Sequence, residues 1–302
     1  MQIYALPYRN ICQSDCWSEF WKQLGWDITQ FDHDIKVRSY PTLFGTRIMV
    51  EKPLIFEESF LRELNIFAEK KRTSYVRVDP TLGQDYSFMG KYKFQNVTKL
   101  LKPFVTTRGC FINLSNETSL LWNNMSKTAK YLIRRAEKAG IEYKYQVSPA
   151  AGDLEIFYEH YSKNGADKNF PTLPYHTLEL FSNIFGGRTA LFTALDKKGQ
   201  YLGGGLFITY ENAVWWIFTT SSDLGKSVSI GYPLLWKSIQ HFKEANYKYM
   251  DLGALYDERY KKEFKGHEGY SIFKLRFKPE VVYFPHPQIH YFNPLYKFFE
   301  TK

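Results

Sequence analysis

The sequence predicts an α/β protein composed of two similar domains. At roughly 150 residues per domain, a chain of 302 residues suits about two. Strand-like runs alternate with amphipathic runs of helical spacing, and one helix–strand pair recurs in each half of the chain. Apolar residues make up 44% of the chain and charged residues 24%, which is the mix of a globular protein and excludes a disordered or collagen-like chain.

The first helix–strand unit is expected within residues 36–80. A strand over residues 46–50 is followed by residues 56–71, where apolar side chains recur at helical spacing. Residues 74–78 then alternate as a strand does and stop at Asp79.

The second unit is longer and is expected within residues 189–253. Three strands should precede a helix over residues 231–245, and one strand should follow it. When Phe60 is laid over Tyr232, both helices and both following strands align, which favours a duplicated domain. The expected strands are residues 189–194, 201–210, 214–220 and 247–252.

A longer helix is expected between the two units, over residues 119–139, with Gly140 as its C-terminal stop. At about 100° per residue, four of its cations fall within an arc of about 80°, opposite its apolar side chains. Such a stripe is a surface for phosphate groups, and the alternative is a solvated helix face. The cations are Lys127, Lys130, Arg134 and Lys138, with Arg135 beside them, and the apolar residues are Leu121, Met125, Leu132 and Ala136.

Two glycine-containing segments fall near the second helix–strand unit. Gly203-Gly204-Gly205 lies within an expected strand, where glycines mark either a bulge or the close approach of a ligand. The loop of residues 222–231 precedes a helix, so its amides can cradle an anion. A P-loop is excluded there, because Thr220 stands where the motif requires its first glycine.

A segment rich in both cations and aromatic side chains spans residues 260–278. It follows the strand that includes Asp251, and the end of a strand with its following loop is a favoured site position in an α/β sheet. The alternative is a basic surface loop followed by an edge strand.

Several common site motifs are missing from the sequence. His-Glu-x-x-His, paired CxxC and GxGxxG motifs are absent, and the seven histidines are scattered. We therefore expect no metal site, no hydrolase triad and no resident cofactor.

Charge and cysteine content restrict the partners and the compartment. The net charge of +9 favours an anionic partner, which is a nucleic acid, a phosphorylated substrate or a membrane surface. Three cysteines cannot form a disulfide framework, and the sequence shows neither a signal peptide nor a run of about 18 apolar residues. These features predict a cytoplasmic protein without stable membrane insertion, and we expect a monomer.

Four segments together resemble the FemABX aminoacyltransferases. Residues 118–140 resemble the family's basic Met-x-Lys-x-x-Arg-x-x-Ile-Arg-Lys-Ala-x-Lys-x-Gly helix, and residues 194–207 resemble its second-domain meander. Residues 231–253 resemble its helix–strand pair, and residues 273–282 resemble its Phe-Lys-x-x-Phe-Gly segment. The order of the four segments is more specific than any one of them.

The resemblance implies two tandem GNAT-like domains, each with a mixed, mostly antiparallel sheet flanked by helices. The domains would comprise residues 1–147 and 148–283, with residues 284–302 packing back on the first. It also implies transfer of an acyl group onto an amine. Members of the family use aminoacyl-tRNA to extend peptidoglycan precursor peptides of the cell wall, whereas wider relatives in the GNAT superfamily use acyl-CoA.

The resemblance further implies a set of site residues. Lys274, with Phe273 before it, would lie at the reacting centre, where a fixed ammonium stabilises the negative charge that develops on the carbonyl oxygen. Lys265 is a rival for this role. Further substrate contacts are expected from Asp251, Tyr175, Gly204 and the tyrosine of Leu255-Tyr256.

Two positions depart from the family pattern. Asn113 stands where the family has an aspartate, so no general base is indicated. Pro171 stands where some members have a nucleotide-binding arginine four residues before a tyrosine, which weakens the case for a UDP-linked acceptor.

Three functions are consistent with these features. The first is Fem-like transfer from an activated donor such as aminoacyl-tRNA to an amine of a cell-envelope precursor, which can be membrane-linked, or of a secondary metabolite. The second is acyl-CoA-dependent N-acyl transfer, with the loop of residues 222–231 holding the CoA pyrophosphate. The third is a non-catalytic RNA-binding or envelope-assembly protein.

Overall fold

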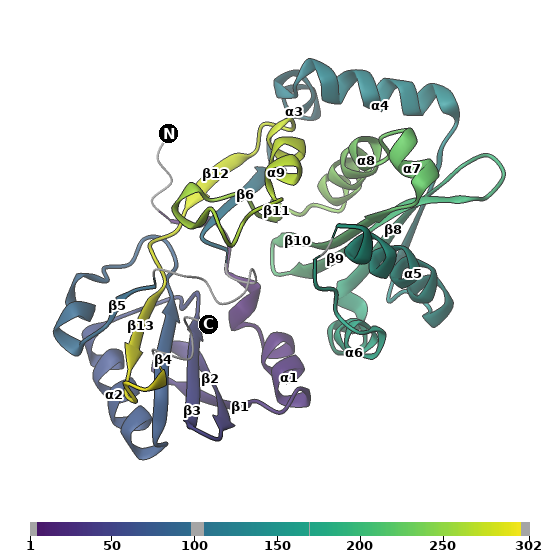
Figure 1. Ribbon diagram of the computed structural model, residues 1–302. Coiled ribbons are helices and arrows are strands. Elements are labelled where there is room, and N and C mark those ends of the chain that lie inside the picture. The colour runs from purple at the N-terminus through teal and green to yellow at the C-terminus, as the bar shows by residue number, and fades with distance from the viewer. Residues whose placement is uncertain (1–4, 98–105, 169, 297–302) are drawn as a thin grey trace. The chain divides into compact units, whose positions relative to one another are not determined.

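The computed structural model describes residues 5–97, 106–168 and 170–296. Within these ranges the chain divides into two compact units (Figure 1). Of the described residues, unit 1 contains 5–97, 106–109, 254–268 and 282–296, and unit 2 contains 110–168, 170–253 and 269–281. The units therefore divide the chain elsewhere than at the boundary expected between residues 147 and 148, since residues 110–147 join the second unit and residues 254–268 join the first.

Unit 1 contains a mixed sheet of six strands. Its order is β1-β2-β3-β4-β13-β5, and β3 and β4 are parallel while the other neighbours are antiparallel. The strand β13 comes from the C-terminal part of the chain and lies between β4 and β5. The strands are β1 (Asp27–Phe31), β2 (Ile35–Thr42), β3 (Gly45–Glu51), β4 (Thr73–Asp79), β5 (Gln95–Asn96) and β13 (Gln288–Tyr291).

The unit 1 sheet buries apolar side chains on both faces. Helix α2 (Glu58–Lys70) packs its buried face against alternate strand residues such as Ile48 and Val50. Met49 points to the opposite face, where it joins a second cluster with Phe264. The expected helix over residues 56–71 and the strands on either side of it are therefore confirmed. Helix α1 is Asp15–Gln23, and short 3₁₀ turns occur at Ile11–Gln13, Asp32–Asp34, Ser87–Tyr92 and Glu258–Tyr260.

Unit 2 is built on a mixed sheet of seven strands. Its order is β12-β6-β11-β10-β9-β8-β7, with β10 and β11 parallel and β7 to β10 antiparallel. The strands are β6 (Arg108–Asn113), β7 (Glu142–Val147), β8 (Thr189–Leu195), β9 (Tyr201–Tyr210), β10 (Ala213–Ser221), β11 (Tyr249–Ala254) and β12 (Glu280–Tyr283).

Helices cover both faces of the unit 2 sheet, and the alternation of strand residues shows which helix covers which face. Leu191 and Leu206 contact the cluster formed by α5 (Ala151–Lys168) and α6 (Tyr175–Phe185). The next residues, Phe192 and Phe207, contact Phe242 of α8 (Gly231–Glu244). Since successive side chains point to opposite faces, α5 and α6 lie on one face and α8 on the other. Short helical turns occur at α7 (Asp223–Ser227) and at Gly186–Arg188.

The prediction of a single helix over residues 119–139 is wrong, because the chain forms two helices there. Helix α3 (Thr118–Asn124) ends before Met125, and α4 (Lys127–Ala139) begins after Ser126. Ser126 has an extended backbone, and its side chain accepts the Ala129 N–H as an N-cap. The expected stop at Gly140 is confirmed, since this residue caps α4 in the left-handed conformation.

The two units repeat one topology. In each, three antiparallel strands lead into a helix and then into a strand parallel to the third, namely β1-β2-β3-α2-β4 and β8-β9-β10-α8-β11. In each, a further strand from a distant part of the chain lies beside the last one, β13 in unit 1 and β6 in unit 2. The duplicated domain and the mixed, mostly antiparallel sheets flanked by helices are confirmed. Among the helices of the described ranges, none combines the length and the apolar character needed to cross a bilayer.

Candidate active site around Lys274

Helix α9 (Glu268–Leu275) positions a buried lysine. Lys274 is only 1% exposed, and it is one of the largest fully buried side chains among the described residues. Its ammonium nitrogen lies 4.0 Å from the centroid of the Tyr270 ring, which is one turn earlier on the same helix. Tyr270 itself is 38% exposed, so its ring separates the ammonium from solvent.

The surroundings of Lys274 disfavour its charged form. Burial lowers the pKa of Lys274 to about 8, while the nearby Cys110 of β6 and Asp251 of β11 act in the opposite direction. An Asp251 carboxylate oxygen accepts the Gly253 N–H at 2.6 Å, which orients this carboxylate. The backbone of Gly253 also borders the lysine, because a Cβ there would lie 3.8 Å from Nζ.

This arrangement suits the stabilisation of developing negative charge. An ammonium held out of water interacts more strongly with an oxyanion than a solvated one, because no water screens the interaction. At neutral pH a lysine with a pKa near 8 remains mostly protonated and is therefore available in the charged form.

Phe273 lies in a different environment from Lys274. Its ring packs against Tyr232 of α8 at 4.9 Å and against Trp216 of β10 at 5.9 Å between centroids. Gly231 makes room for it, since a Cβ there would come to 3.4 Å from the ring. Phe273 thus packs α9 against the α8 face of the sheet. The contacts found for this residue, which was expected to be catalytic, are packing contacts.

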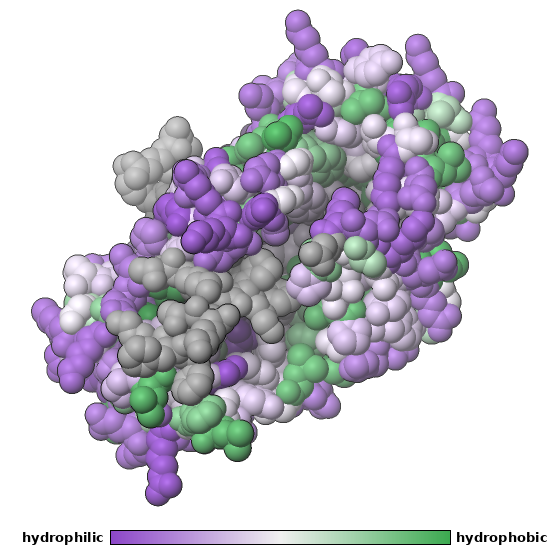
Figure 2. All heavy atoms as spheres, viewed as in Figure 1, coloured by the Kyte–Doolittle hydropathy of each residue, from purple (hydrophilic) through white to green (hydrophobic). Residues whose placement is uncertain are grey.

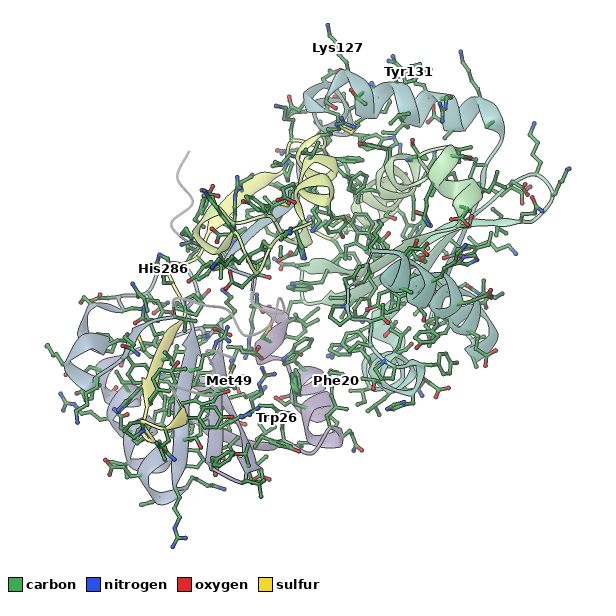
Figure 3. The ribbon with its side chains drawn as sticks, in the orientation of Figure 1. Phe20, Trp26, Met49, Lys127, Tyr131 and His286 are labelled. Carbon is green, nitrogen blue, oxygen red and sulfur yellow. The ribbon has the colours of Figure 1, made fainter. Side chains whose placement is uncertain are left out.

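The cations of the expected basic stripe lie on α4, with Ala129, Ile133 and Ala136 buried on the opposite side. All of them are exposed except Lys130, which is half-buried. Lys127 and Tyr131 point away from unit 2 (Figure 3). Three of the cations also contact the protein. Lys130 Nζ donates to the Asn123 carbonyl, Arg134 lies 5.3 Å from the Trp122 ring, and Arg135 donates to the Ser227 carbonyl.

A hydrogen bond links this basic surface to the helix that carries the lysine. The Ser126 N–H donates to the carbonyl of Arg276 at 2.8 Å, and Arg276 follows directly after α9. The start of α4 is therefore fixed to the end of α9 within unit 2. The sequence indicated the basic cations and Lys274, but neither the helix α9 nor this link.

Tyr175 and Gly204 are not brought to the lysine. Tyr175 begins α6 and packs against Tyr158 of α5 at 5.3 Å, on the face of the sheet opposite α8. A Cβ at Gly204 would meet Phe157 of α5, so this glycine also faces α5. Because Phe273 attaches α9 to the other face, the sheet lies between these two residues and Lys274.

The glycines of β9 are explained by packing alone. A Cβ at Gly203 would come to 2.8 Å from the Thr220 carbonyl oxygen, and one at Gly205 would come to 2.7 Å from the Trp216 ring nitrogen. These contacts account for the glycines without a ligand. The register shift between Ala194 and Leu195 of β8, which lies beside Gly203, is consistent with the bulge alternative.

The amides of the loop over residues 222–231 are largely engaged within the loop. Ser222 caps α7 by accepting the Gly225 N–H, and the N–H groups of Lys226, Ser229 and Ile230 donate to carbonyls of the same loop. Lys226 pairs with Asp223 at 2.9 Å, and the hydrogen bonds from Lys163 and Lys226 lower the pKa of Asp223 to about 2. These donors are already occupied, which argues against a phosphate cradle in this loop.

Lys265 and Tyr256 belong to unit 1. Lys265 is exposed and follows the fully buried Phe264. The Tyr256 carbonyl accepts a hydrogen bond from Arg108 at 2.9 Å. Within unit 2, Asp251 is an expected substrate contact that interacts electrostatically with Lys274.

Sequence reasoning missed Tyr270 and Cys110. Residues 273–277 alternate between apolar and basic side chains, as an edge strand would, so the helical spacing of Tyr270 and Lys274 was hidden. Cys110 lies on β6, which joins β11 only in the folded sheet. A pairing of this kind across the sheet leaves no signal in the local sequence.

The duplicated mixed sheets have the GNAT fold, and the family match of residues 123–262 supports an acyltransferase. Residues 123–262 match the family model described as the acetyltransferase (GNAT) domain. This match covers most of unit 2 and includes α4, the β8–β11 core and α8.

Solved structures show the same fold over nearly the whole chain. FemX has a TM-score of 0.79 at 14% identity, with 97% of this chain and 95% of FemX covered. L-PGS from Bacillus licheniformis has a TM-score of 0.61 at 11% identity, covering 91% and 88%. A tandem GNAT protein from the clavulanic acid biosynthesis pathway has a TM-score of 0.53 at 9% identity, covering 85% and 78%. At these identities the likeness concerns the fold. No curated protein matches the sequence.

Proposed function

We propose that this chain is a Fem-like aminoacyltransferase that moves an aminoacyl group from aminoacyl-tRNA to an amine. The observation that carries the proposal is the buried ammonium of Lys274, which lies beneath Tyr270 and beside Asp251. The fold that the chain shares with FemX over its length supports the same reading.

In the proposed reaction the neutral acceptor amine attacks the carbonyl carbon of the aminoacyl ester. A C–N bond forms, and the carbonyl oxygen gains negative charge that Lys274 stabilises as an ammonium. The intermediate collapses by breaking the bond to the ribose oxygen. The proton lost by the amine ends on that oxygen, relayed by substrate groups or water, so the lysine is not consumed.

The basic surface of α4 supports a polyanionic donor. Its exposed cations face outward, and the bond from Ser126 to Arg276 fixes this surface to the helix of Lys274. Phosphates of the tRNA would bind there while the ester end reaches the lysine. Acyl-CoA is less well supported, because the amides and the lysine of the 222–231 loop are already engaged.

For the acceptor we propose an amine of a cell-envelope component. The resemblance to the FemABX family points to a peptidoglycan precursor. One of the similar folds is titled as the C-terminal domain of a putative lysylphosphatidylglycerol synthetase, and this name suggests a lipid acceptor as the alternative. Because aminoacyl-tRNA is the donor, we place the reaction in the cytoplasm.

The test uses a pool of charged tRNA and a panel of amine acceptors. The wild-type protein should transfer the aminoacyl group, and Lys274→Ala should lose at least about a hundredfold in rate. Lys198→Ala, which changes an exposed lysine in the β8–β9 turn, is the matched control and should retain full activity. Full activity in Lys274→Ala would remove this residue from the mechanism.

Thermal-shift titration separates the two donors. Charged tRNA should raise the melting temperature and CoA should not, since a ligand stabilises only the fold that binds it. Stabilisation by CoA alone would replace this proposal with the acyl-CoA alternative.

A further inference from the structure

The β2–β3 hairpin of unit 1 ends in a turn whose two side chains are large, apolar and turned outward. Leu43 is 98% exposed and Phe44 is 53% exposed. Both lie at the tip between Thr42 of β2 and Gly45 of β3. A leucine exposed to this extent does not stabilise the fold through the hydrophobic effect, because almost none of its apolar surface is removed from water.

The backbone of this turn is nonetheless held firmly. The Phe44 carbonyl accepts the Ser74 hydroxyl at 2.6 Å, and the Thr42 hydroxyl donates to the Gly45 carbonyl at 2.5 Å. Gly45 has a φ of +114°, and a Cβ there would lie 2.5 Å from the Arg72 carbonyl oxygen. The turn is thus fixed in a shape that presents Leu43 and Phe44 to the outside.

Two other loops reach the same end of the unit 1 sheet. The start of β4 pairs with the start of β3, which brings residues 70–72 to the turn, and Thr46 N–H donates to the Arg72 carbonyl. The segment after β13 also arrives there, because Asn293 donates to the Phe44 carbonyl and Leu295 is 64% exposed. We name Leu43, Phe44 and Leu295 the apolar tip.

Basic side chains surround the apolar tip. Lys70, Lys71 and Arg72 are exposed, and Arg47 lies two residues after Gly45. Glu69 and Asp27 are the acidic residues beside them, and Asp27 lies 3.7 Å from Lys71. In Figure 2, hydrophobic and hydrophilic side chains lie next to one another at the lower end of unit 1, where Figure 1 shows the β2–β3 turn.

We propose that the apolar tip docks this protein on an anionic phospholipid surface. Leu43, Phe44 and Leu295 would enter the headgroup region, while Lys70, Lys71 and Arg72 would face lipid phosphates. The membrane is favoured over a folded protein partner because the exposed cations Lys70, Lys71 and Arg72 lie beside the apolar side chains and complement lipid phosphates. The contact is reversible, since three side chains provide far less apolar area than a spanning helix. It is independent of the chemistry proposed above.

The test measures co-sedimentation with vesicles and needs no enzymatic activity. Wild-type protein should bind vesicles of phosphatidylglycerol and phosphatidylcholine more tightly than vesicles of phosphatidylcholine alone. The double variant Leu43→Ser/Phe44→Ser should weaken binding to the mixed vesicles at least about tenfold. Lys70→Gln/Arg72→Gln should reduce the preference for phosphatidylglycerol and its sensitivity to salt.

The matched control is Leu54→Ser/Ile55→Ser. Leu54 and Ile55 are each partly exposed, at 36% and 37%. They follow β3 at the end of the sheet away from the turn. This variant should bind vesicles as the wild type does, and both double variants should keep the wild-type melting temperature. Equal losses of vesicle binding in Leu43→Ser/Phe44→Ser and in Leu54→Ser/Ile55→Ser would overturn the proposal. The absence of vesicle binding by the wild type would do the same. A dimer in solution that Leu43→Ser/Phe44→Ser converts to a monomer would overturn it as well, because a second copy would then cover the tip.

Discussion

A single titrating residue, Lys274, gives the site its character. Burying a lysine ammonium usually destabilises the folded protein, because the cation loses its hydration when it leaves water. Here Tyr270 covers the ammonium with the face of its ring, and the carboxylate of Asp251 lies nearby. The lysine therefore remains a usable cation at neutral pH, close to the point at which it would lose its proton.

The first prediction at this scale concerns the pH profile of transfer. Burial lowers the pKa of Lys274 to about 8, so the protonated form that stabilises an oxyanion is lost as the pH rises through that value. Calculated per neutral acceptor amine, kcat/KM should be level below pH 7 and fall about tenfold per unit well above pH 8. A value calculated in the same way that instead rises through pH 8 would assign the neutral Lys274 amine as a general base.

The second prediction concerns the cover over the ammonium. Tyr270→Ala should admit water to Lys274, which weakens the desolvation that lowers its pKa and shifts the basic limb of the profile to higher pH. Tyr270→Phe keeps the ring and should restore the wild-type limb. Ile272→Ala changes an exposed residue of the same helix and serves as the control. A limb that stays in place in Tyr270→Ala would show that the ring does not shield the lysine.

At the scale of elements, the fold was predicted well where one helix packs on one sheet. The helix α2 and its flanking strands follow the hydrophobic period, because one face of the helix is buried and the other is exposed. The helix α8 was also found from its period, although α4 packs on it and leaves Glu244 as its one exposed residue. Two elements failed for physical reasons. The alternation of residues 273–277 imitates a strand and hides the end of α9, and the break at Ser126 is accompanied by a hydrogen bond to Arg276, which is far away in the sequence. Local sequence cannot report a contact that only the folded chain makes.

The β9–α7 contact gives a prediction about stability. A Cβ at Gly225 would lie 1.8 Å from the Leu202 carbonyl oxygen, and backbone atoms on both sides cannot move apart easily. Gly225→Ala should destabilise the protein by about 1–3 kcal/mol, lowering the melting temperature by several degrees. Gly152→Ala, where a Cβ would meet nothing within 4 Å, should leave it unchanged or slightly higher. Equal melting temperatures for the two variants would show that the loop adapts to the added methyl group.

At the scale of the whole molecule, the chain's charge of +9 gains meaning from where its cations lie. A uniform excess attracts any polyanion weakly, whereas cations gathered on one helix release several counterions at one place. The exposed cations of α4 belong to the same unit as Lys274, and the bond from Ser126 to Arg276 joins the two helices. This coupling is what a large charged donor requires, because its phosphates and its reactive ester must be held at a fixed separation.

The last prediction separates a placed basic surface from net charge. Lys127→Ala/Lys138→Ala and Lys261→Ala/Lys262→Ala each remove two exposed cations, the first pair from α4 and the second from unit 1. If α4 binds tRNA phosphates, the first variant should lower tRNA affinity and reduce the slope of log K against log salt by about 1.4 to 1.8. The second variant should leave the slope near the wild-type value. Identical slopes in both variants would mean that tRNA senses only the total charge, and the basic stripe would then be an ordinary solvated helix face.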